Sequence, residues 1–158
     1  MRSKVIIASL AAFAVAAVSC SSQKAETISS QEASIDSYIE KSHSEREVHR
    51  DGGSNRIVMV LGEGDGIVAG DRTTVGLKGH IFSNGPGTLF YDDTVTVKIG
   101  AGEVISGLDT GLRGARAGEQ CYIVFSAKYG FYDKAVGIVP AMSPLLYEAE
   151  IISIEKAK

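Results

Sequence analysis

The chain has 158 residues, enough for one ordinary domain plus short additional segments. Hydrophobic residues make up 44% and charged residues 22%, as is typical of a globular protein, and the net charge of −3 gives no reason to expect a nucleic-acid partner. The 18 glycines, nearly all of them after Gly52, indicate the many tight turns that antiparallel sheets need.

The N-terminus is typical of a secretory signal peptide over residues 1–19. Two basic residues precede an apolar run at residues 5–18, which is too short to form a stable membrane span. The run ends at Ala17-Val18-Ser19-Cys20, which is similar to a lipobox, although Ala17 stands where such motifs usually carry Leu. We therefore expect a lipid on Cys20 that anchors the protein to a membrane. The alternative is an ordinary cleaved signal peptide in which Cys20 is incidental.

Lipidation of Cys20 would leave Cys121 as the only free thiol, so no intrachain disulfide is expected. Cys121 lies in an apolar run and is predicted to be buried and inert. Ser21 and Ser22 give no sign of retention in the inner membrane. This favours a place in the cell envelope at the outer membrane, with the folded domain facing the periplasm.

Residues 20–55 are polar and are predicted to form a lipidated, partly helical stalk. Ser29 and Glu32 have the spacing of a capping box, and a thin apolar stripe follows them. This pattern predicts a helix near residues 30–42 that docks weakly or serves as a spacer. The charged segment at residues 43–49 is expected to be solvated.

The domain predicted at residues 56–158 contains strands and one short helix. Ile105, Leu108 and Leu112 are spaced three and four apart, which places them on one face of a helix. Strands are expected at residues 57–61, 73–77, 89–91, 94–99, 121–126 and 145–154. The expected fold class is α+β: a twisted antiparallel sheet of about five strands wrapped on one short α-helix.

Three segments of this domain resemble FKBP-type peptidyl-prolyl cis-trans isomerases. Ile99-Gly100-Ala101-Gly102-Glu103-Val104-Ile105-Ser106-Gly107-Leu108 is similar to the family's segment in which a strand ends and a Val-Ile pair leads into the helix. Gly137-Ile138-Val139-Pro140 resembles the family's late turn, and Leu145-Leu146-Tyr147-Glu148-Ala149-Glu150-Ile151 resembles its closing strand. The resemblance covers about residues 56–154 and implies an isomerase of this type in a bacterial lipoprotein form.

Such a protein accelerates rotation about the amide bond before proline. The rotation is opposed by a barrier of roughly 18–20 kcal/mol and breaks no bond, so no nucleophile, cofactor or metal is expected. An apolar pocket that binds the twisted amide better than either planar form is sufficient. The expected partners are therefore proline-containing polypeptides and, through the lipid, a membrane, with no nucleic acid and no metal.

The resemblance also implies which residues form the site. Aligning Gly130-Phe131-Tyr132 with the family's Gly-Tyr-Gly places Phe131 where the family has a hydrogen-bonding Tyr, and Tyr129 or Tyr132 could then substitute for the missing hydroxyl. Ile105 would offer a backbone N–H. The implied catalytic residues are Phe90, Val104, Ile105, Phe131, Tyr132 and Tyr147. The implied substrate-binding residues are Leu77, Tyr91, Asp92, Val95, Leu108, Tyr129, Ile138 and Val139.

Four departures from the family's pattern indicate a reduced activity. Leu77, Val95 and Leu108 stand where the family often carries aromatic residues, and Tyr91 stands where Asp usually follows Phe90. Loss of one aromatic wall costs on the order of 1 kcal/mol in binding. The sequence favours an isomerase that assists the folding of exported proteins. The alternatives are a catalytically weak, FKBP-like lipoprotein that binds peptides or a partner, and a purely structural lipoprotein.

Overall fold

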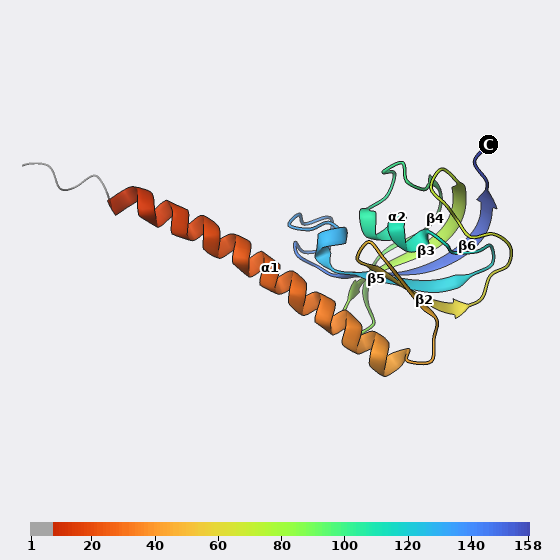
Figure 1. The fold of residues 1–158 in the computed structure, drawn as a ribbon, viewed down its shortest axis with the longest axis horizontal. Coiled ribbons are helices and arrows are strands. Elements are labelled where there is room, and N and C mark those ends of the chain that lie inside the picture. The colour runs from red at the N-terminus through yellow and green to blue at the C-terminus, as the bar shows by residue number, and fades with distance from the viewer. Residues whose placement is uncertain (1–7) are drawn as a thin grey trace, which may run out of the picture.

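The protein consists of a long N-terminal helix followed by a sheet domain (Figure 1). A computed structural model describes residues 8–158 and the side chains of residues 19–158, so residues 1–7 of the expected signal peptide lie outside the described residues. The N-terminal helix, α1, spans Ala8–Ser42. Within this part of the chain, none of the helices has the length and apolar character needed to cross a membrane.

Six antiparallel strands form one sheet in the spatial order β1-β2-β5-β6-β3-β4. The strands are β1 (Val48–Asp51), β2 (Ser54–Val60), β3 (Arg72–Phe82), β4 (Pro86–Lys98), β5 (Gln120–Phe125) and β6 (Leu145–Glu155). A short helix, α2 (Ser106–Leu112), contacts β2 and β5, and a 3₁₀ turn, η1 (Ala127–Tyr129), follows β5 (Figure 1). The predicted antiparallel sheet with one short helix is confirmed, with six strands where about five were expected.

Three elements differ from the sequence prediction. β4 is one strand where two were predicted, because the intervening Asp92 and Asp93 stay paired with β3. α1 begins well before residue 30, although it ends where the capping and apolar pattern predicted. β1 occupies part of the segment that was expected to be solvated, because the positive φ angles of Gly52 and Gly53 allow a tight hairpin with β2.

The sheet has an inner face, which packs against α2, and an outer face, which packs against α1. Alternation along β5 makes this division: Ile123 and Phe125 belong to the inner cluster, whereas Val124 belongs to the outer one. Leu108 and Leu112 of α2 are buried in the inner cluster, which confirms the predicted apolar face of this helix.

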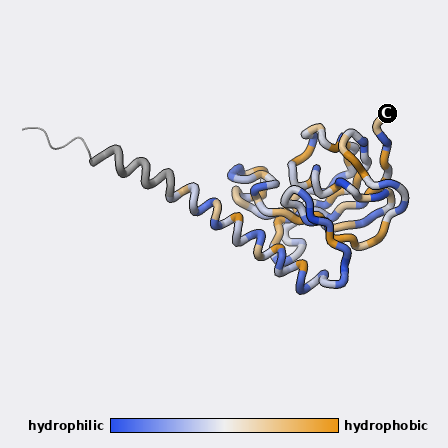
Figure 2. Tube along the Cα trace, in the orientation of Figure 1, coloured by the Kyte–Doolittle hydropathy of each residue, from blue (hydrophilic) through white to orange (hydrophobic). Residues whose placement is uncertain are grey.

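α1 is docked on the outer face of the sheet and is not a loose spacer. Ile35, Tyr38 and Ile39 are each at most 8% exposed. Their partners in the outer cluster are the strand residues Ile57, Phe82, Val124 and Leu146. Figure 2 shows the apolar positions of α1 recurring among hydrophilic ones along its C-terminal half, so even a thin stripe is sufficient to bury one side of the helix.

Polar contacts extend this docking to the β5–β6 connection, residues 126–144. The Gln31 side chain donates from Nε2 to the Met142 carbonyl at 2.7 Å and accepts at Oε1 from the Ala127 N–H at 2.9 Å. Lys24 Nζ lies 2.8 Å from Asp133 Oδ2. α1 therefore holds the β5–β6 connection at Ala127, Asp133 and Met142.

Replacement of Ile35 by Ala should destabilise the domain by about 2–4 kcal/mol, because it removes buried methyl and methylene groups and leaves a cavity between α1 and the sheet. Urea denaturation followed by circular dichroism measures this change. Ile28→Ala is the matched control, since Ile28 lies on the same helix, is only partly buried and is outside the outer cluster. Equal losses for the two variants would contradict the docking of α1 through Ile35.

Candidate active site

Four aromatic rings meet on the inner face of the sheet, and we refer to Phe90, Phe125, Phe131 and Tyr147 as the aromatic cluster. Phe90 makes edge-to-face contacts with Phe131 and Tyr147, at centroid distances of 6.2 and 5.8 Å. Tyr147 also stacks on Phe125 at 6.1 Å, with 20° between the ring planes. Phe90 and Phe131 are only partly buried, so the cluster presents ring surface to solvent.

A bulge in β4 brings two consecutive aromatic residues to this side of the sheet. Gly79 pairs with Tyr91 and His80 pairs with Leu89, which leaves Phe90 without a partner on β3. Such an extra residue changes the direction of a side chain, and both Phe90 and Tyr91 pack against the inner cluster. A strictly alternating strand would place one of them on the outer face.

Gly79 makes room for these rings. A Cβ atom at this position would lie 2.8 Å from Phe90 Cζ and 2.9 Å from Tyr147 Cε1, closer than carbon atoms approach without a bond. The absence of a side chain at Gly79 therefore lets the two rings meet over the backbone of β3.

Val104 and Ile105 lie at the start of α2 and are partly buried against the inner cluster. The Ile105 carbonyl accepts from the N–H groups of Leu108 and Asp109, at 3.0 Å each, and so begins the helix. The Ile105 N–H itself donates to no group in the described part of the chain. Phe90, Phe131, Val104 and Ile105 thus pack against the inner cluster, which contains Tyr147.

The remaining predicted residues divide between core, rim and outer face. Leu77 and Leu108 are each 3% exposed and Val139 is 1% exposed, so they support the site from behind. Val95 is partly buried on the inner face, next to Val75 of β3. Ile138 is 65% exposed at the tip of a tight turn closed by two hydrogen bonds between Val136 and Val139.

Two tyrosines of the β5–β6 connection, Tyr129 and Tyr132, lie away from the aromatic cluster. Tyr132, with a left-handed φ of 53°, places its ring 5.6 Å from Lys24 Nζ of α1. In the alignment with the family's Gly-Tyr-Gly pattern, Tyr132 takes the place of the last Gly. Glycine is the residue that adopts a left-handed φ most readily, so the backbone of Tyr132 has the conformation expected at that position. Tyr129 packs its ring over Gly53 in the turn between β1 and β2. Neither side chain makes a ring contact with the aromatic cluster in the described structure.

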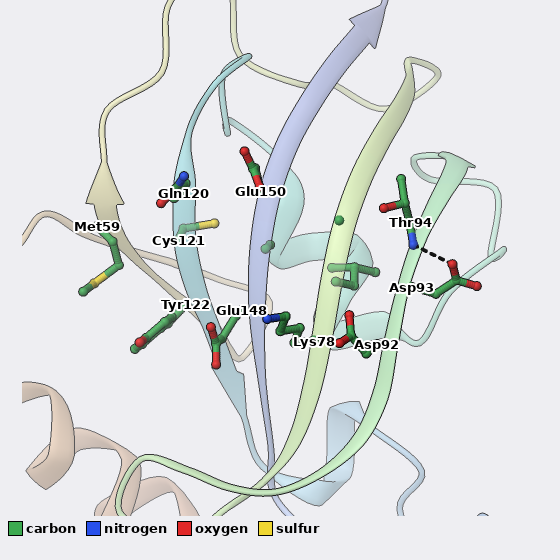
Figure 3. A pocket seen from close by; sticks show the side chains of 13 residues that line it. Met59, Lys78, Asp92, Asp93, Thr94, Gln120, Cys121, Tyr122, Glu148 and Glu150 are labelled. Carbon is green, nitrogen blue, oxygen red and sulfur yellow. Dashed lines mark hydrogen bonds between the residues drawn. The ribbon is translucent and has the colours of Figure 1, made fainter.

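Asp92 lies on the outer face and not in the site, because strand alternation places it opposite Tyr91. It lines a hollow of about 470 Å³ together with Lys78 and Glu148. Figure 3 shows Tyr122, Glu148, Lys78 and Asp92 in a row across the strands β5, β6, β3 and β4. The structure therefore does not bring Asp92 together with the aromatic cluster, although the resemblance assigned it to substrate binding.

Sequence reasoning missed Phe125 as a member of the site. The signal was present, because Cys121, Ile123 and Phe125 alternate along one strand and share a face. The burial of Cys121 is confirmed: burial and the neighbouring Glu119 raise the pKa of its thiol to about 12, so it stays protonated and unreactive. No group of three or more His, Cys, Asp or Glu residues among those described could hold a metal ion.

The fold and the aromatic cluster together define a domain of the FKBP type. The family model for FKBP-type peptidyl-prolyl cis-trans isomerases matches residues 64–152. The chain therefore belongs to this family, whose members catalyse peptidyl-prolyl isomerisation.

Two fungal relatives agree with this assignment. The chain is 39% identical to FK506-binding protein 2 of Podospora anserina over 89 residues, which cover 54% of this chain and 48% of the relative. It is 30% identical to FK506-binding protein 1 of Aspergillus oryzae over 114 residues, which cover 65% of this chain and 98% of the relative. The chain thus spans about half the length of the first relative and nearly all of the second.

Two bacterial crystal structures show the same fold. FkpA from Escherichia coli has a TM-score of 0.65 at 22% identity, over 99% of this chain and 76% of that one. A peptidyl-prolyl cis-trans isomerase from Pseudomonas syringae has a TM-score of 0.67 at 18% identity, over 83% of this chain and 95% of that one.

Replacement of Gly79 by Ala should displace the rings of Phe90 and Tyr147 and cost about 1–3 kcal/mol of stability, because the added methyl group overpacks the cluster. Ring-proton NMR shifts and the midpoint of urea denaturation measure these effects. Gly76→Ala on the same strand is the control, since its Cβ would have Thr94 Oγ1 at 3.7 Å, an ordinary contact. Unchanged ring shifts in Gly79→Ala would contradict the tight contact over β3.

Proposed function

We propose that this chain is a peptidyl-prolyl cis-trans isomerase that assists the folding of exported proteins. One observation carries the proposal: the aromatic cluster and the free N–H of Ile105 lie on the same side of the sheet, at the start of α2. The rings provide an apolar surface for a prolyl ring, and the N–H provides a donor for a peptide carbonyl. Such a surface favours the twisted amide, which has lost the resonance dipole of the planar forms.

The β5–β6 connection supports a polypeptide substrate rather than a small molecule. Ile138 and Val136 are exposed apolar side chains at the tip of this connection. Phe131, on the same connection, contacts Phe90 in the cluster. Residues that flank the proline in a substrate can therefore find apolar contacts beyond the cluster itself.

A second candidate is an FKBP-like domain that binds proline peptides with little catalysis. Two substitutions favour it: Phe131 carries no hydroxyl, and Tyr91 replaces the family's usual Asp. In addition, the buried Leu77 and Leu108 offer no ring surface to a ligand. A comparison of rate with binding separates the two candidates.

The protein should accelerate the cis-trans isomerisation of a proline-containing tetrapeptide in a protease-coupled assay, and Phe90→Leu should lower kcat/KM about tenfold. The loss reflects the contribution of one aromatic contact, roughly 0.5–1.5 kcal/mol. Leu89→Ala is the control, because Leu89 is the adjacent residue and is paired outside the bulge. FK506, which the fungal relatives are named for binding, should compete with the peptide.

Two results would contradict the proposal in different ways. Peptide binding without acceleration over buffer would favour the binding domain. Absence of both acceleration and binding would exclude the two candidates together and leave a structural role.

We further propose that Cys20 carries a lipid that holds the domain at the outer membrane, facing the periplasm. The cysteine is exposed on α1, where its thiol is accessible to modification. The isomerase domain would then remain in water beside newly exported chains.

Replacement of Cys20 by Ser should move the protein from the membrane fraction to the soluble periplasmic fraction and abolish incorporation of labelled palmitate, because it removes the attachment atom. Thr27→Ala, an exposed change on the same helix, should leave both unchanged. Palmitate incorporation that persists in Cys20→Ser would contradict the assignment.

A further inference from the structure

The hydroxyl of Tyr147 has no hydrogen-bond partner among the described residues. The residue as a whole is 5% exposed, yet its hydroxyl is not among the fully buried polar atoms that lack a partner, so water or a ligand can reach it. A phenolic hydroxyl can donate one hydrogen bond, and a ligand carbonyl can take the place of a water molecule as its acceptor. The aromatic cluster thus carries a donor that the protein itself leaves free.

The surroundings of Tyr147 indicate where that ligand would lie. Tyr147 on β6 pairs with Gly79 on β3, and Gly79 pairs with Tyr91 on β4, so the two tyrosines flank a glycine in one row across the inner face. Gly79 places no side chain between them. Burial raises the pKa of Tyr147, and the nearby Tyr91 raises it further, so Tyr147 remains a protonated donor throughout the neutral range.

The other tyrosines are engaged away from the aromatic cluster. Tyr38 contacts His43 and Phe82 on the outer face, and Tyr122 contacts His43 there as well. Tyr129 lies over Gly53, and Tyr132 lies beside Lys24. Phe131, which contacts Phe90, has no hydroxyl to offer.

We propose that the Tyr147 hydroxyl, assisted by Tyr91, is the side-chain donor that holds a carbonyl of the prolyl peptide in this site. The inference rests on the proposed function and names the polar contact that the substrate makes there. The aromatic cluster binds the prolyl ring, the Ile105 N–H holds one carbonyl, and Tyr147 holds another. The side-chain donor of this site therefore lies on strand β6, whereas the resemblance places the family's hydrogen-bonding Tyr on the β5–β6 connection.

The central test is Tyr147→Phe, which deletes only the hydroxyl. With the tetrapeptide substrate, kcat/KM should fall about fivefold to tenfold, and the Kd for the same peptide should rise, as expected for loss of one hydrogen bond. The denaturation midpoint should not fall, because the hydroxyl has no partner in the free protein. A purely structural role would instead lower stability and leave the kinetics of the folded protein unchanged.

Two further variants sharpen this test. Tyr122→Phe removes a hydroxyl from the outer face and should leave kcat/KM and Kd as in the wild type. Phe131→Tyr, introduced into the Tyr147→Phe protein, restores a hydroxyl at a ring that contacts Phe90 and should recover at least half of the lost kcat/KM.

The outcomes separate this inference from the proposed function. If the wild type isomerises the peptide and Tyr147→Phe stays within twofold of it in both kcat/KM and Kd, the inference is overturned and the function stands. If the wild type binds the peptide without catalysis, the Kd alone tests the inference. A Kd of Tyr147→Phe within twofold of the wild-type value overturns it, and a larger Kd supports it. If the wild type neither binds nor isomerises the peptide, both are overturned.

Discussion

The close approach of α2 to the sheet is the constraint on which the site depends. Gly107 and Gly111 lie four residues apart, on one face of the helix. A Cβ atom at Gly107 would lie 2.4 Å from Phe125 Cγ, and one at Gly111 would lie 2.3 Å from Ile123 Cγ2, so the helix backbone rests directly on β5. Because Phe125 also stacks on Tyr147, the position of the helix and the position of the rings are fixed by the same side chain.

The outer face contributes to the site through the β5–β6 connection. This connection carries Phe131 into the aromatic cluster, and α1 binds it through Gln31 and Lys24. α1 is itself fixed by the buried residues of the outer cluster. The N-terminal helix is therefore part of the framework that holds the aromatic cluster in place.

The sequence predicted most of the elements, because alternation in strands and three-four spacing in α2 are local properties. It did not predict the bulge at Phe90 or the burial of α1, since both depend on pairing between distant residues. The FKBP resemblance placed Val104, Ile105 and Tyr147 in the site, yet it could not decide among Tyr129, Phe131 and Tyr132. That decision required the backbone of the β5–β6 connection, in which the left-handed Tyr132 turns its ring toward α1.

The replacement of the family's usual Asp by Tyr91 changes the electrostatics of the site. The aromatic cluster, Tyr91, Val104 and Ile105 contain no side chain that is charged near neutral pH, and burial raises the pKa of both Tyr91 and Tyr147. A carboxylate beside these rings would have to be desolvated when a prolyl ring covers it, whereas a phenol loses much less on leaving water. Neutral donors suit this chemistry, because the twisted amide carries no net charge and has lost part of its dipole. Under the proposed function, a site with hydroxyls in place of a charged group can still distinguish the twisted amide from the planar one.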